Sequence, residues 1–296
     1  MKTRLKGNDL AQLVATVLCS TFVITAHAAP TVITNGVDTS ATIDDAGYFS
    51  ATSSLGLSFM GREFVNHGNF WSFYSLNANG LSAGIANEDD GSNPFGSTAI
   101  ANVDGSVLVM SGPGSDWSII QKVSIPESGH VAVEIQLTNH TGATATDVEW
   151  GVGLDPDQGI PASLGFETRN VIDAVGENAS VTATSPDGWA ITLANLTGGA
   201  TSTIAANINC CDLDPHNMLI AGQLPGNYGF TDLLINLAYD FGTINNNQTV
   251  SFGYEYIMAI SDPFTPPPIP EPSSYAMLLA GLGLLGFAVH RRKQNT

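Results

Sequence analysis

Positive charge is the property that this sequence has least of. Nine lysine and arginine residues stand against 27 aspartate and glutamate residues, and the formal net charge is −18. Most of the cations lie near the two ends of the chain, so the body keeps only Arg62, Lys122 and Arg169. A surface this acidic repels nucleic acid and anionic membrane surfaces, and it attracts divalent cations. The composition therefore argues against a nucleic-acid partner.

Between its two ends the chain also lacks sustained helical periodicity. The N-terminal segment differs from the body, because it combines positive charge with a run of apolar residues. Three cations within the first six residues precede an apolar run at 10–24. The run ends at Ala26 and Ala28, whose small side chains fit the pockets of signal peptidase. We predict that residues 1–28 form a signal peptide with a helical core, cleaved between Ala28 and Ala29. A buried N-terminal helix is the alternative.

The other end of the chain carries a second targeting segment. Residues 262–272 form a proline-rich spacer, and residues 273–296 contain an apolar stretch at 275–289 followed by three cations at 291–293. The stretch of about 15 residues spans roughly 22 Å as a helix, less than a ~30 Å hydrocarbon core. Cations after the span keep the tail in the cytoplasm. The pattern predicts a short transmembrane helix that anchors the protein in the inner membrane with its body outside.

The order of Pro-Glu-Pro, short apolar helix and basic tail resembles the PEP-CTERM sorting signals of Gram-negative bacteria that make exopolysaccharide. The resemblance covers about the last 27 residues of the chain. It implies transient membrane anchoring, processing by an exosortase-type enzyme, and a final location at the cell surface or in the extracellular matrix. The residues that carry the motif are Pro270, Glu271, Pro272, Arg291 and Arg292.

The body of the chain, residues 29–261, alternates apolar and polar side chains in short segments. The clearest are 131–137, 148–154, 233–239 and 250–260. Strict alternation is typical of half-buried strands, because successive side chains point to opposite faces of a sheet. The turn-rich connection between the first two segments predicts an antiparallel hairpin. We expect an all-β domain, an antiparallel β-sandwich of two packed sheets.

Cysteine is scarce, and the only pair in the body is adjacent: Cys210 and Cys211. Neighbouring cysteines can close a strained ring, and export favours oxidation. We expect a vicinal disulfide, with intermolecular pairing or free thiols as the alternatives. The nearby Asp212, Asp214 and His216 offer too few ligands to indicate a metal site here.

Two carboxylates, Asp155 and Asp157, stand two residues apart and are followed by Gly159. This is part of a calcium-loop pattern, but it lacks the distal bidentate glutamate of an EF-hand. Asp155 and Asp157 are therefore candidate calcium ligands, and calcium is the only cofactor that the sequence indicates. The alternative is an acidic turn in which Asp155 accepts hydrogen bonds from the local backbone.

Catalytic patterns are missing. The sequence has no Gly-x-Ser-x-Gly elbow, no His-Glu-x-x-His and no phosphate-binding glycine loop. Glu134 and Glu149 lie on the polar faces of the predicted hairpin, where a carboxylate pair could serve glycoside hydrolysis or simply be solvated.

The tryptophans could present flat faces to sugar rings. Trp150 shares its strand face with valines, and Trp71 alternates with Phe73, so the core is the competing interpretation for both. The sequence thus predicts an exported, non-catalytic protein with a structural or adhesive role in exopolysaccharide or biofilm. A carbohydrate-binding or polysaccharide-cleaving β-sandwich is the alternative. The expected partners are signal peptidase, an exosortase-type enzyme and extracellular polysaccharide.

Overall fold

The structure is a computed structural model that describes residues 30–49, 56–65, 72–86, 95, 98–111, 115–196 and 203–261. The chain divides after Pro263, and all of the described residues belong to the first unit. Within these ranges no helix has both the length and the apolar character needed to cross a membrane. Several residues of the two predicted targeting segments lie outside the described residues: Ala28, Ala29, Pro270, Glu271, Pro272, Arg291 and Arg292.

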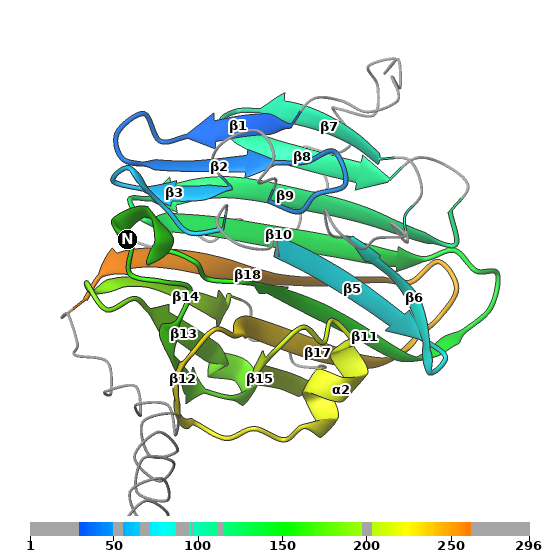
Figure 1. The fold of residues 1–296 in the computed structure, drawn as a ribbon. Helices are drawn as coiled ribbons and strands as arrows, with labels where there is room; N and C mark the ends of the chain where they lie inside the picture. The colour runs from blue at the N-terminus through cyan, green and yellow to red at the C-terminus, as the bar shows by residue number, and fades with distance from the viewer. Residues whose placement is uncertain are drawn as a thin grey trace, which may run out of the picture. The chain divides into compact units, whose positions relative to one another are not determined.

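One layer of the fold is a nine-stranded antiparallel sheet, in which the last strand of the chain, β18, runs through the middle (Figure 1). In β10 the side chains of Val133, Ile135 and Leu137 are buried, while Glu134 and Gln136 between them are partly exposed. This is the alternation that the sequence predicted. The strands, in spatial order, are β16 (Gly226–Thr231), β12 (Thr168–Ala174), β13 (Ser180–Thr184), β14 (Trp189–Asn195), β18 (Thr249–Ile260), β10 (His130–Asn139), β9 (Trp117–Glu127), β8 (Ser106–Ser111) and β7 (Thr98–Val103).

Two smaller antiparallel sheets face this layer. The first has five strands, in the order β15 (Thr203–Asn209), β17 (Leu234–Ile244), β11 (Ala145–Leu154), β5 (Ser72–Ala78) and β6 (Leu81–Ala86). The second has four, in the order β1 (Thr31–Thr34), β2 (Thr39–Ile43), β3 (Leu57–Phe59) and β4 (Arg62–Glu63). The two sheets meet where the Phe49 backbone N–H donates to the Ser72 hydroxyl and the Tyr74 hydroxyl donates to the Ala46 carbonyl.

A single apolar core joins the large sheet to both small ones. At its centre Trp150 of β11 stacks on Tyr74 of β5, with ring centroids 4.8 Å apart, and meets Phe252 of β18 edge-on at 5.5 Å. Stacked and edge-on aromatic pairs add about 0.5–1.5 kcal/mol each to the free energy gained by burial. Trp150 therefore fixes the two layers against each other.

The all-β class and the antiparallel pairing that the sequence predicted are confirmed. The predicted hairpin is wrong: β10 pairs with β9 and β18, whereas β11 pairs with β17 and β5. The connection between them crosses from one layer to the other, around the fully buried Asn139, whose amide donates to the carbonyls of Ala143 and Ile244. The second layer also consists of two sheets, where the sequence predicted one.

Helical structure in the described part of the chain is limited to η1 (Ile160–Ala162), η2 (Gly176–Asn178) and α2 (Pro215–Ile220). Asp214 caps the N-terminus of helix α2, where its side chain accepts a hydrogen bond from the His216 backbone N–H. Met218 of the helix packs with Phe73 and Leu234 on the outward face of the five-stranded sheet. The helix thus covers part of a face that would otherwise be open to water.

Candidate metal centre

Strand pairing explains why acidic residues from distant parts of the chain meet at one place. Strands β11 and β17 run antiparallel, and Leu154 at the end of β11 lies opposite Ile235 at the start of β17. Asp155 follows β11 directly, and Asp232 lies between β16 and β17. The two strand ends therefore bring these carboxylates to the same edge of the sheet.

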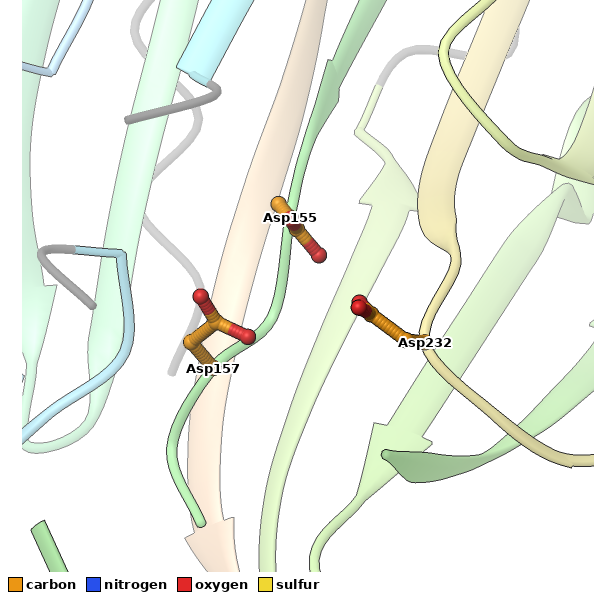
Figure 2. A group of neighbouring side chains, drawn as sticks. All are labelled: Asp155, Asp157 and Asp232. Atoms are coloured by element: carbon orange, nitrogen blue, oxygen red, sulfur yellow. The ribbon is translucent and has the colours of Figure 1, made fainter. Parts of the chain in front are cut away.

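Asp155, Asp157 and Asp232 form one cluster, in which the carboxylate oxygen atoms that could bind a metal lie within 4.8 Å of one another. Figure 2 shows the three side chains converging from the loop after β11 and from the segment before β17. Asp157 is fully buried, Asp155 is partly buried and Asp232 is exposed. The cluster thus runs from the interior of the protein to its surface.

The carboxylate of Asp157 is buried without hydrogen-bond partners on either oxygen atom. The loop holds its shape through the backbone instead: the Asp157 N–H donates to the Phe64 carbonyl, and the Ile160 N–H donates to the Asp157 carbonyl. Among the described residues, no hydrogen bond to the carboxylate of Asp155 accompanies its raised pKa, which burial and the charge of Asp232 cause. These oxygen atoms are available to a ligand.

Burial and neighbouring negative charges disfavour the ionised form of all three carboxyl groups. Burial, followed by the negative charges of Asp155, Asp232 and Glu63, raises the pKa of Asp157 to about 9. Burial and then the charge of Asp232 raise the pKa of Asp155 to about 7. Burial also raises the pKa of Asp232. Ionising all three carboxylates together is therefore unfavourable near neutral pH, and a positive charge at this place would favour it.

The neighbouring cation Arg62 interacts with groups outside the acidic cluster. Its guanidinium donates to the carbonyl oxygen of Gln158 at 2.5 Å and to Asp187 at 2.7 Å, and it lies 4.8 Å from the ring centre of Trp189. The arginine braces the loop that carries Asp157 without neutralising the cluster. The donor set of the cluster is oxygen only, which suits hard cations such as calcium or magnesium better than zinc or copper.

The cysteine pair lies in a different part of the molecule. Cys210 and Cys211 form a vicinal disulfide in the exposed loop between β15 and α2. The acidic residues beside it are used within the loop: Asp212 accepts from the Asn217 amide, and Asp214 caps α2. The structure therefore does not gather them with the sulfur atoms as a metal site.

The two glutamates considered for catalysis do not face each other. Glu134 lies on the outward face of the nine-stranded sheet, 3.6 Å from Lys122. Glu149 lies in the other layer and is bonded to His216, with 2.9 Å between Oε1 and Nδ1. Because the core separates them, they cannot act on the two sides of one glycosidic bond, and that hypothesis is wrong.

The structure brings together a serine, a histidine and an asparagine that the sequence analysis did not connect. The Ser118 hydroxyl lies 2.8 Å from His140 Nε2, and His140 Nδ1 lies 3.4 Å from the Asn247 side-chain oxygen. Nucleophile, base and orienting group follow this order in many hydrolases. Both contacts are exposed to solvent, and water weakens them. We therefore interpret these residues as a polar group on the surface.

Two of the tryptophans are core residues. Trp117 and Trp150 are buried, and Trp189 packs against Phe59 and Phe64. Trp71 lies outside the described residues. Among the residues that the structure describes, the tryptophans thus do not form a sugar-stacking platform.

Comparison with known proteins addresses the end of the chain. Residues 268–293 match the PEP-CTERM protein-sorting motif. The match includes all five sorting residues predicted from the sequence, so the chain is an exported protein that carries the motif read by an exosortase and is anchored at the membrane before processing. No curated protein matches the chain.

Solved structures resemble the body of the chain only distantly. A mutant of the heparan sulfate lyase HepC from Pedobacter heparinus is 11% identical, with a TM-score of 0.41 and coverage of 77% of this chain and 34% of its own. The structure titled Heparinase III-BT4657 gene product is 9% identical, with a TM-score of 0.44 and coverage of 86% and 40%. This chain spans well under half of either protein, and such a likeness assigns neither a substrate nor an activity.

Proposed function

We propose that this protein is a non-catalytic, structural or adhesive component of the surface or extracellular matrix of a Gram-negative bacterium. The observation that carries the proposal is the sorting motif at 268–293, which is typical of exported proteins and implies processing by an exosortase. The net charge of −18 supports an extracellular role, since divalent cations there can screen an acidic surface.

The outward face of the nine-stranded sheet supports an adhesive role. Hydroxyl groups pair across its strands: Thr138 with Thr249 at 2.8 Å, and Thr182 with Thr192 at 2.7 Å. Hydroxyl groups on this face suit contacts with a hydrated polymer such as polysaccharide, because they both donate and accept hydrogen bonds.

Location is tested in the native host by fractionation and mass spectrometry of the protein's ends. We expect a mature form that begins at Ala29 and lacks residues 291–293. A variant without residues 268–293 should be absent from the surface fraction. Detection of the intact polypeptide in the cytosol, with both ends retained, would contradict the proposal.

Adhesion is tested by incubating the full chain with the host's own exopolysaccharide. Retention of the protein without shortening of the polymer is the expected result, and shortening would mean that the protein is an enzyme. Thr249→Glu places a charge on the hydroxyl face and should reduce retention. Thr203→Glu, an exposed position on β15 in the other layer, is the matched control and should not.

A further inference from the structure

We propose that Asp155, Asp157 and Asp232 form a calcium site that fastens the end of β11 to the start of β17. The inference starts from the convergence of the three side chains, whose ligand atoms lie within 4.8 Å of one another. It concerns cation binding by the β domain and does not depend on the proposed adhesive role.

The spacing of the oxygen atoms fits one calcium ion. Calcium binds oxygen at about 2.3–2.6 Å, so ligands on opposite sides of the ion are roughly 4.6–5.2 Å apart. One carboxylate oxygen atom from each of the three residues already lies within that span. Three carboxylates can supply up to about six of the 6–8 oxygen ligands that calcium takes. Asp232 is exposed, so water can supply the remaining ligands on that side.

The buried state of Asp157 is a separate observation that points to a cation. Both of its carboxylate oxygen atoms lack a hydrogen-bond partner, and so does the side-chain oxygen of the adjacent Gln158. A buried ionised carboxylate without a partner is unfavourable by several kcal/mol. A proton would relieve one carboxylate only, whereas a divalent cation relieves all three at once.

Calcium fits this place better than magnesium does. Magnesium demands near-octahedral geometry at about 2.0–2.1 Å and keeps several of its water molecules. Asp157 is fully buried, so the interior side of the site has to be supplied by protein oxygen atoms and not by water. The flexible coordination of calcium accepts such a mixed environment.

The bound ion would join segments that belong to different layers. Asp232 lies where the chain leaves β16 of the nine-stranded sheet and enters β17 of the five-stranded sheet. Asp155 and Asp157 lie in the loop that leaves β11 and leads through η1 to β12. An ion held by all three would therefore tie together two crossings between the layers.

The experiment uses the full chain, first freed of metal with EDTA and then titrated with calcium chloride or magnesium chloride. Equilibrium dialysis with elemental analysis measures the ions bound per chain, and thermal unfolding measures the melting temperature. We expect one tightly held calcium per chain, a higher melting temperature in calcium, and a clearly smaller rise in magnesium at the same concentration.

Variants locate the ion. Asp232→Asn removes the negative charge and one of the two oxygen atoms at an exposed position, so the protein should still fold while its calcium affinity falls by more than about tenfold. Asp104→Asn makes the same charge change in the exposed turn between β7 and β8, where the positive φ of 49° also suits asparagine. It should bind calcium as the unaltered protein does.

Two results would overturn the proposal. One is the absence of stoichiometric calcium from the unaltered protein together with equal melting temperatures in calcium and in EDTA. The other is an equal loss of affinity in Asp104→Asn and Asp232→Asn, which would mean that calcium is attracted only by the overall charge.

Discussion

Replacing Asp157 with asparagine should make the metal-free protein more stable at neutral pH, although the residue is fully buried. In the absence of a cation, the folded protein keeps this carboxyl group protonated at neutral pH, because neither of its oxygen atoms has a hydrogen-bond partner and nearby carboxylates disfavour its charge. An asparagine side chain has nearly the same shape and no charge to lose. The variant therefore removes a penalty that the unaltered protein carries at every pH above the ordinary pKa of an aspartate.

The magnitude follows from the pKa. It rises from 3.8 to about 9 in the folded protein. A raised pKa means that the folded state holds the proton more tightly than the unfolded state does, so the metal-free stability is greatest below pH 3.8 and falls as the pH rises towards 9. The slope is about 1.4 kcal/mol per pH unit, which amounts to about 4 kcal/mol at pH 7. The buried amide of asparagine costs about 1–3 kcal/mol at every pH.

The assay is urea unfolding of both proteins in EDTA between pH 4.5 and pH 8. The variant should be the less stable protein at the acidic end and the more stable one at pH 8, so the two stability curves should cross. Asp155 titrates in both proteins, so its contribution largely cancels when the free energies of unfolding of the two proteins are subtracted. Parallel curves, or a variant that is less stable throughout, would refute the assigned burial and charge environment.

Three further predictions concern other parts of the fold. Trp150→Ala should lower the free energy of unfolding by about 3–5 kcal/mol in urea, because it leaves a cavity between the layers, and a loss below about 1 kcal/mol would contradict the packing described. Gly129→Ala should lower the melting temperature more than Gly36→Ala: both glycines have positive φ, but a methyl group at Gly129 would also collide with a carbonyl oxygen of β18. The bond to Glu149 raises the pKa of His216 above its usual 6.5, so this pair stabilises the protein at low pH and the effect fades as the pH rises through the raised pKa. His216→Gln should therefore lower the melting temperature at pH 5.5 and have less effect at pH 8.5; an equal effect at both would count against the ion pair.

Alternation along the chain reveals which face a strand side chain occupies, but it does not reveal the partner strand. The inward positions of β10 and β11 were predicted correctly from their apolar residues, and both strands do contribute to the core. The predicted pairing of these two strands with each other was wrong, because an amphipathic strand can pair with any neighbour that has a matching apolar face. The chain crosses between the layers next to Asn139, a buried side chain that is bonded to the carbonyls of Ala143 and Ile244. The residues around Asn139 are typical of an ordinary turn, so the sequence did not reveal the crossing.

The candidate metal centre shows the same limit. Asp155 and Asp157 are close in sequence, and their spacing was enough to suggest a cation. Asp232 lies 75 residues further along the chain than Asp157 and carries no motif of its own. It joins the cluster only through the register between β11 and β17, which is a property of the folded sheet. A ligand supplied by long-range pairing is therefore visible only in the structure.

The position of β18 has a consequence for the order of events during export. This strand is the last one described, yet it pairs on one side with β10 and on the other with β14, and so joins the two halves of the nine-stranded sheet (Figure 1). A chain that crosses the membrane from its N-terminus delivers this connecting strand only shortly before the sorting motif that begins at residue 268. Until then each half of the sheet has an open edge where β18 will insert. Completion of the domain and arrival of its membrane anchor thus become nearly simultaneous steps.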